Sequence, residues 1–351
     1  MQGTTGNPKG ACLSHHNIVN NGKFIGLRLG YNKKPHKIAF PAPLYHTFGC
    51  VMANISALHY GASVVLTGPH FNAKECLDAI EQESCTSVYG TPTMFTDMIE
   101  TMKLHPINTS SVETGIMAGA PCPEKLCKDV VKDLNAKHFT VAYGMTETSP
   151  VSFQGFPEDS IELKTTTIGY PAAHCEVKVV DEDGKIVPVG TPGELCTRGY
   201  SVMLGYWNDK DKTKEIMNNG WLHSGDLGVI HANGYGQIVG RIKDMVIRGG
   251  ENLFPREIEE RVLHHPEVAE AYVIGVPDDR MGEELCAWIK LQADSKDVTE
   301  QDIKAFCKET LAHFKIPRYI LFVNEFPQTV TGKIQKFKMR EQSIDLLKIQ
   351  K

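Results

Sequence analysis

Residues 139–148 read Phe-Thr-Val-Ala-Tyr-Gly-Met-Thr-Glu-Thr, a short apolar run followed by a polar turn. The apolar part has the length and composition of a buried strand. Similar runs occupy residues 63–66, 86–89 and 115–118, and segments with helical spacing lie between them at 74–82, 93–102 and 123–134. Strands that alternate with helices form a parallel sheet with helices packed on its faces. We therefore predict an α/β fold with a doubly wound sheet of buried strands.

The polar turn is a candidate metal site. Glu147 and Thr146 follow the strand 139–142 directly, at the carboxyl end where open α/β sheets bind ligands. A carboxylate beside a hydroxyl suits a Mg²⁺ ion that bridges nucleotide phosphates. The alternative is a plain strand-to-helix turn with a glutamate in its first helical turn, which is common.

The N-terminal loop is the second candidate. It reads Gly3-Thr4-Thr5-Gly6-Asn7-Pro8-Lys9-Gly10. Glycines let backbone N–H groups approach a polyphosphate, threonines add donors and Lys9 adds a positive charge. Walker A loops instead carry Gly-Lys-Ser/Thr at the start of a helix, whereas here we predict that the helix begins beyond Ser14. A solvated, flexible terminus is the alternative.

The sequence pattern changes twice along the chain. Residues 168–239 carry alternating runs and turn signals typical of a small antiparallel β unit. From about residue 243, helical patterns at 255–264 and after Thr299 combine with strands at 271–275, 286–291 and 319–323, which predicts an α+β domain. The predicted division is residues 1–166 for part of a large domain, 167–242 for its β-rich part and 243–351 for a mobile C-terminal domain.

Composition excludes several classes of protein. A net charge of −5 argues against general binding to nucleic acid or anionic membranes, and charges interrupt every apolar run that could span a bilayer. The ten cysteines include no Cys-x-x-Cys pair, so we predict reduced, mostly buried thiols, with neither a zinc site nor a disulfide framework.

Four further motifs are ordinary when each is taken alone. Asp226 could accept from two ribose hydroxyls or occupy a β-turn, and Gly249-Gly250 could admit a ligand or form a plain turn. The charged run 240–244 is typical of a solvated linker, and the lysine that ends 327–333 is typical of an exposed loop.

Taken in order, the motifs resemble those of the adenylate-forming superfamily, which comprises acyl-CoA synthetases, firefly-type luciferases and peptide-synthetase adenylation domains. The resemblance runs from residue 1 to about residue 340. The matching segments are 4–10, 43–49, 118–121, 143–147, 193–195, 205–207, 221–226, 240–244, 249–252 and 332–333. Within the superfamily, residues 278–284, 313–317 and 332–338 more specifically resemble the mitochondrial medium-chain acyl-CoA ligases.

The resemblance implies a two-step ligase that uses ATP, Mg²⁺ and coenzyme A. A fatty-acid carboxylate would attack the α-phosphate of ATP, and coenzyme A would then displace AMP from the acyl-adenylate. Lys333 would be the main catalytic cation, together with Thr146 and the Mg²⁺ ligand Glu147. The ATP site implied by the resemblance comprises Thr4, Thr5, Gly6, Lys9, Gly119, Ala120, Pro121, Tyr143, Asp226, Arg241 and Lys333.

The resemblance also implies an acyl pocket and a moving domain. The acyl pocket would be lined by His46, Phe48, Gly119 and Met145. Lys243 would be the hinge about which the C-terminal domain rotates, bringing Gly249 and Gly250 to the pantetheine arm of coenzyme A. The implied partners are small-molecule substrates, with no nucleic acid and no membrane span, and the sequence leaves the oligomeric state open.

The pattern departs from the family at residue 1, which falls inside the phosphate loop. We expect the N-terminal part of the large domain, and the transit peptide of a mitochondrial enzyme, to lie upstream of this residue. On that expectation the 351 residues alone lack turnover and are poorly soluble. A non-catalytic protein that retains nucleotide or partner binding is the alternative function.

Overall fold

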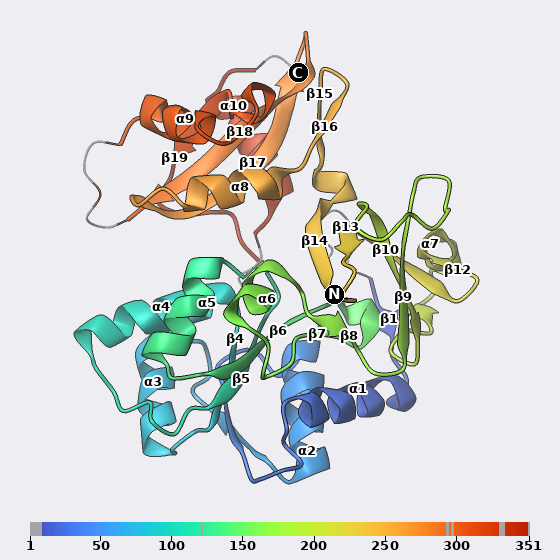
Figure 1. The fold of residues 1–351 in the computed structure, drawn as a ribbon, viewed down its shortest axis with the longest axis vertical. Helices are drawn as coiled ribbons and strands as arrows, with labels where there is room; N and C mark the ends of the chain where they lie inside the picture. Colours follow the sequence, from blue (N-terminus) through green and yellow to red (C-terminus); the bar gives the residue numbers. More distant parts are fainter. Residues whose placement is uncertain (1–8, 121, 293–294, 296–297, 330–333, 350–351) are drawn as a thin grey trace. The chain divides into compact units, whose positions relative to one another are not determined.

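The computed structural model describes residues 9–120, 122–292, 295, 298–329 and 334–349 (Figure 1). The chain divides into two compact units. The first contains residues 1–224 and 228–238, and the second contains residues 225–227 and 239–351.

A seven-stranded sheet forms the centre of the first unit, in the order β3-β2-β4-β5-β6-β7-β8. The strands from β2 to β6 pair in parallel, and β7 and β8 extend the sheet in antiparallel fashion. Their bounds are β2 (Lys37–Phe40), β3 (Ser63–Leu66), β4 (Ser87–Gly90), β5 (Thr114–Ala118), β6 (His138–Gly144), β7 (Val151–Gln154) and β8 (Tyr170–Pro171).

Helices cover both faces of this sheet. Successive strand residues point to opposite faces, so that Met117 of β5 joins a core with the helices α3, α4 and α5, while Ile116 joins a core with α1 and the π-helix η1. The predicted doubly wound arrangement is therefore confirmed. The helices are α1 (His15–Arg28), η1 (Phe48–Ile55), α2 (Ser56–Tyr60), α3 (Ala73–Gln82), α4 (Pro92–Leu104), α5 (Glu124–Asp133) and α6 (Ile161–Thr166).

The prediction that residues 63–66 form a buried strand is right about the strand and wrong about its burial. These residues do form β3, but β3 lies at the edge of the sheet, and the side chain of Leu66 is 58% exposed. A short apolar run looks the same in sequence whether its strand is central or peripheral, and an edge strand has one neighbour fewer to cover it.

The predicted antiparallel β unit is confirmed as a second sheet, in the order β12-β13-β10-β9, with β14 beside β13. Its strands are β9 (Cys175–Val180), β10 (Gly193–Gly199), β12 (Met217–Asn218), β13 (Trp221–Ile230) and β14 (Gly236–Arg241), and α7 (Lys210–Ile216) precedes β12. A separate two-stranded ladder joins β1 (Ala11–Cys12) to β11 (Gly205–Tyr206).

The second unit contains an α+β arrangement of the predicted kind, and it also includes residues 225–227 and 239–242, which lie before the predicted start at residue 243. Its sheet follows the order β16-β15-β18-β17, with β19 parallel to β18. Apolar side chains from Ile258, Val273 and Ile303 join helices and strands in one core. The elements are β15 (Val246–Arg248), β16 (Glu251–Leu253), α8 (Pro255–Leu263), β17 (Val268–Asp278), β18 (Gly282–Leu291), α9 (Glu300–Lys308), β19 (Tyr319–Phe322) and α10 (Lys336–Leu346), with short 3₁₀ turns η2 (Thr146–Thr148), η3 (Ile242–Asp244) and η4 (His313–Lys315).

The cysteines are all free thiols, and seven of the ten are buried. Burial raises the pKa of the Cys76 thiol to about 12, so that this thiol stays protonated and unreactive. Within the described residues, no helix is long and apolar enough to cross a membrane.

Candidate active site

Lys9 is placed by a short strand pairing. Ala11 pairs with Tyr206 and Cys12 with Gly205, and the N–H of Trp207 donates to the carbonyl of Gly10 at 2.7 Å. On the far side of β1, Ser14 caps α1 as predicted, since its hydroxyl accepts from the N–H of Asn17 at 3.1 Å. The ladder holds Lys9 against β11, with its Nζ 5.4 Å from the centre of the Tyr206 ring.

Glu147 reaches the same tyrosine from the turn η2, which follows β6. The Tyr206 hydroxyl donates to Glu147 Oε1 at 2.6 Å, and the backbone of Glu147 is held by Met203, whose N–H donates to its carbonyl at 2.9 Å. Glu147 is 8% exposed. Burial, and then the adjacent carboxylate, raise the pKa of Tyr206, so the phenol remains a donor. One aromatic side chain therefore contacts both the predicted phosphate-binding lysine and the predicted metal-binding glutamate.

The turn that carries Glu147 depends on a glycine. A Cβ on Gly144 would lie 1.8 Å from the carbonyl oxygen of Pro150, and the N–H of Met145 donates to that same oxygen at 3.0 Å. The backbone can approach this closely only where no side chain intervenes. Gly144 therefore allows β6 to end in the tight turn Thr146–Thr148.

Several predicted site residues share the carboxyl edge of the parallel strands. Gly119 and Ala120 follow β5 and are exposed, and Tyr143 lies at the end of the neighbouring strand β6, with Ala118 paired to Ala142. Gly119 has a φ of +94°, which favours glycine. Met145 and Thr146 come next along the chain and are half-buried. Ligands of open α/β sheets bind at this edge.

His46 and Phe48 follow β2 at the same edge but differ in exposure. His46 is exposed, and its Nδ1 accepts from the N–H of Phe48 at 3.1 Å. Phe48 is 5% exposed and stacks on Tyr89 with ring centres 5.9 Å apart. Phe48 begins the π-helix η1, a rare geometry that is frequent at functional sites.

Asp226 and Arg241, both in the second unit, form an ion pair. Arg241 Nε lies 3.0 Å from Asp226 Oδ1, and the Asp226 side chain is 6% exposed while that of Arg241 is 33% exposed. The arginine orients a carboxylate that has further lone pairs for hydroxyl donors. The two residues predicted to hold the ribose are therefore in contact with each other.

Lys243 and the glycine pair lie farther along the second unit. Lys243 is exposed in η3. Gly249 and Gly250 form the two-residue turn between β15 and β16, with φ of +59° and +88°. Two successive positive φ values are those of a type I′ hairpin turn, and a Cβ on Gly250 would meet nothing within 4 Å.

Five of the predicted residues lie outside the described part of the chain, namely Thr4, Thr5, Gly6, Pro121 and Lys333. No role for Tyr206 is predicted from the sequence, although the segment 205–207 is among the matched motifs. Its part in the site follows from the β1–β11 pairing, which joins residues nearly 200 positions apart and which sequence spacing does not predict.

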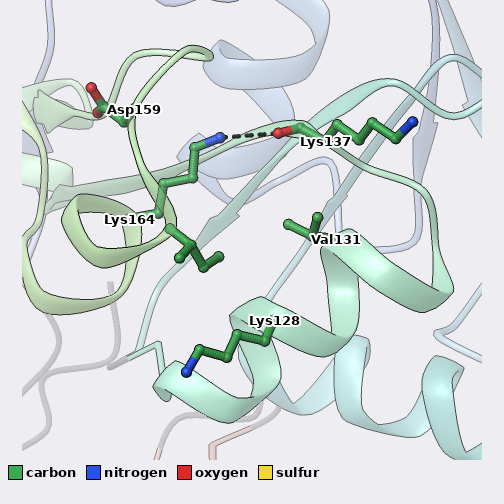
Figure 2. A pocket seen from close by; sticks show the side chains of 6 residues that line it. Lys128, Val131, Lys137, Asp159 and Lys164 are labelled. Carbon is green, nitrogen blue, oxygen red and sulfur yellow. Dashed lines mark hydrogen bonds between the residues drawn. The ribbon is translucent and has the colours of Figure 1, made fainter.

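A cavity of about 240 Å³ lies in the first unit, lined by Lys128, Val131, Lys137, Asp159, Ile161 and Lys164 (Figure 2). The ammonium group of Lys164 donates to the carbonyls of Lys137 at 3.0 Å and Pro157 at 2.8 Å. Burial lowers the pKa of Lys164, partly offset by Asp159. Lys164 therefore has a structural role in the wall of this cavity, because its hydrogen bond to Lys137 joins α6 to the loop before β6.

Two family models match the chain. Residues 3–207 match the AMP-binding enzyme family, and residues 257–333 match the AMP-binding enzyme C-terminal domain. The medium-chain acyl-CoA ligase ACSF2, mitochondrial, of Danio rerio is 50% identical over 344 residues, which cover 97% of this chain and 57% of that protein. The chain therefore spans a little more than half the length of this curated relative.

Solved structures of enzymes that bind ATP or an acyl-adenylate are similar to this chain. The ATP-bound MatB of Rhodopseudomonas palustris has a TM-score of 0.89 and 30% identity, over 98% of this chain and 67% of that one. The o-succinylbenzoate CoA synthetase MenE of Bacillus subtilis, in complex with its acyl-adenylate intermediate, has a TM-score of 0.85 and 30% identity, over 97% and 68%. With more than half of its length matched by the family model, the chain belongs to the AMP-binding enzymes.

Proposed function

We propose that this protein is an AMP-forming acid–thiol ligase that activates a fatty acid with ATP and transfers the acyl group to coenzyme A. The observation that carries the proposal is the convergence of Lys9 and Glu147 on Tyr206. A cation and a carboxylate held by one rigid side chain provide complementary contacts for a polyphosphate and for its metal ion.

In the adenylation step, the acyl carboxylate attacks the α-phosphorus of ATP and pyrophosphate leaves. Charge grows on the phosphoryl oxygens, so preplaced positive charge contributes most of the catalysis. We assign the β- and γ-phosphates to Thr4, Thr5, Gly6 and Lys9, and the α-phosphate and substrate carboxylate to Lys333. Gly119, Ala120, Pro121 and Tyr143 would frame the adenine, and Asp226 with Arg241 would hold the ribose.

Glu147 is the proposed ligand of Mg²⁺, with Thr146 beside it. Within the described residues, the side-chain hydrogen bond that its carboxylate accepts comes from Tyr206, and a carboxylate has lone pairs for further partners. Mg²⁺ is commonly held by one or two carboxylates together with substrate phosphates, so this residue fits the ion. When bound, Mg²⁺ would neutralise the charge of the phosphates.

In the thioester step, the thiol of coenzyme A attacks the acyl carbon and AMP leaves. Rotation of the C-terminal domain about Lys243 would bring Gly249 and Gly250 to the pantetheine arm. The exposed hairpin turn at these glycines has no side chains to obstruct a narrow ligand. The acyl chain would lie against His46, Phe48, Gly119 and Met145.

The finer assignments rest on the named relative. The ACSF2 ligase of Danio rerio is named as medium-chain and mitochondrial, so we propose medium-chain acids as substrates and the mitochondrion as location. The comparisons do not support the alternative of a non-catalytic binding protein, because the relatives are named as ligases and synthetases.

The test is pyrophosphate release from ATP across fatty acids of increasing chain length, with and without coenzyme A. Carboxylate-dependent pyrophosphate release, with acyl-CoA formed only when coenzyme A is added, is expected. Pyrophosphate release without any thioester would instead indicate an adenylating enzyme with another acceptor. Hydrolysis of ATP that does not depend on a carboxylate would overturn the proposal.

A further inference from the structure

Three metal-ligating side chains of the second sheet converge on one point outside the proposed ATP site. Glu194 and Cys196 lie two residues apart on β10, so they share one face of the sheet, and His223 comes from the neighbouring strand β13. One ligand atom from each residue lies within 4.8 Å of the other two.

The geometry differs from that of a nucleophile–base–acid triad. In a triad the imidazole uses one nitrogen for the nucleophile and the other for the carboxylate. Here the same nitrogen, His223 Nδ1, lies 3.5 Å from Cys196 Sγ and 2.6 Å from Glu194 Oε2. The imidazole therefore does not pass a proton from one partner to the other. Three ligand atoms that lie close to one another, as here, are typical of a metal site.

The distances suit a tetrahedral ion. Zinc bonds of about 2.3 Å to sulfur and about 2.0 Å to nitrogen, at a tetrahedral angle, place those two atoms about 3.5 Å apart. The Cys196–His223 separation is 3.5 Å. The Glu194–His223 separation of 2.6 Å is that of a hydrogen bond, and it must open to about 3.3 Å as the ion replaces the shared proton.

Charge and exposure are also consistent with an ion. A thiolate, a carboxylate and a neutral imidazole carry two negative charges, which a divalent ion neutralises. Cys196 is fully buried, whereas the His223 and Glu194 side chains are 26% and 22% exposed, so an ion can enter from their side. Burial, and then the adjacent Glu194 carboxylate, raise the pKa of the Cys196 thiol to about 12, and Lys178, its partner on β9, offsets only part of that rise. Binding of an ion would therefore displace the proton of this thiol.

We propose that Glu194, Cys196 and His223 form a site for a zinc-class transition-metal ion, with solvent as the fourth ligand. Three protein ligands and an open position distinguish it from closed structural zinc sites. Binding would join β10 to β13 and so stabilise the second sheet. The prediction from cysteine spacing that zinc is absent rests on Cys-x-x-Cys pairs, and this cluster contains a single cysteine.

Cobalt titration of the metal-free, reduced protein tests the proposal, with excess Mg²⁺ present to occupy sites made of hard oxygen ligands. One equivalent of Co²⁺ is expected to produce a thiolate-to-cobalt charge-transfer band and tetrahedral visible bands, both removed by zinc. Cys196→Ser should abolish the charge-transfer band, and Glu194→Gln and His223→Asn should each weaken binding about 100-fold or more.

The matched controls are Cys50→Ser, which removes the exposed cysteine, and Cys175→Ser, which removes a half-buried one on the same sheet. Both should retain the full band. Circular dichroism and thermal melting of each variant without metal establish that it is folded. A folded wild-type protein without the band at stoichiometric cobalt would overturn the proposal. A band that persists in Cys196→Ser, or that disappears in Cys50→Ser, would do the same.

Discussion

The hydroxyl of Tyr206 lies 2.6 Å from Glu147 Oε1, although the two residues are 59 positions apart in the chain. The hydrogen bond fixes the carboxylate, and the ring of the same tyrosine packs under the ammonium group of Lys9. Tyr206 is thus a positioning residue for both groups, and its loss should affect catalysis more than stability.

Tyr206→Phe should lower the rate of adenylation about 10- to 100-fold, because a hydrogen bond to a charged group contributes about 1.5–3 kcal/mol. The Mg²⁺ concentration for half-maximal rate should rise as well. Both are measured by pyrophosphate release at varied Mg²⁺. Tyr235→Phe is the matched control, since Tyr235 donates to Asp159 at 2.5 Å, and it should change neither. An unaltered Mg²⁺ dependence in Tyr206→Phe would show that the tyrosine does not position Glu147.

Asp226→Asn should raise the KM for ATP about tenfold or more with a smaller change in kcat, because ribose contacts are similar in the ground and transition states. Initial rates at varied ATP separate the two parameters. Asp278→Asn, which alters the ion pair of Asp278 with Arg318 at 2.8 Å, is the control and should leave the KM unchanged. A loss confined to kcat would contradict the ribose assignment.

Lys333→Ala should abolish adenylate formation and leave thioester formation from supplied acyl-adenylate largely intact. The cation is needed only while charge develops on the α-phosphate. The two half-reactions are assayed separately, with the exposed Lys338→Ala as control. Equal losses in both half-reactions would rule out this division of work.

Lys243→Pro should spare adenylation and block thioester formation, because proline fixes φ at the proposed hinge. Lys243→Ala keeps the backbone free and should retain both half-reactions. Normal thioester formation in the proline variant would place the pivot elsewhere or exclude a rotation.

Lys164 should make a pH-dependent contribution to stability. Burial holds its pKa below the usual 10.5, so the unfolded chain binds more protons between the two pKa values, and the contribution of this lysine rises with pH. The difference in free energy of unfolding between the wild type and Lys164→Met should therefore increase from about pH 8 to about pH 10. Urea unfolding at each pH measures it, and a difference that falls with pH would contradict the sign.

Of the parallel strands, β4, β5 and β6, with the helices between them, could be predicted from local pattern, because each strand is an apolar run bounded by turns. The strand β2 was not predicted, although it lies inside the same sheet. The exposure of β3 could not be predicted in this way, because it depends on which strands become its neighbours in the sheet. The segment 48–60 and α10 were also not predicted. Residues 48–57 are apolar without a clear period, and α10 mixes apolar and charged residues on most sides.

The individual residues of the candidate site were assigned from the resemblance of the sequence motifs to the family. Physical reasoning from the sequence alone indicated a phosphate loop around Lys9 and a metal ligand at Glu147. It could not indicate Tyr206 or the cluster at Cys196, because both depend on pairing between distant strands. Pairing between distant strands depends on the packing of the whole fold, and it cannot be read from local strand propensity.

The ladder between β1 and β11 has a consequence for biosynthesis. Its two strands lie nearly 200 residues apart, so the ribosome releases the parallel sheet long before Tyr206 emerges. Tyr206 lies about 60 residues beyond the end of β6 at Gly144, so at about 5–20 residues per second the interval is about 3–12 s. Lys9 therefore acquires its aromatic partner late in synthesis, and slowed translation before residue 206 should prolong a nascent form in which the sheet is folded and Lys9 has not yet met Tyr206.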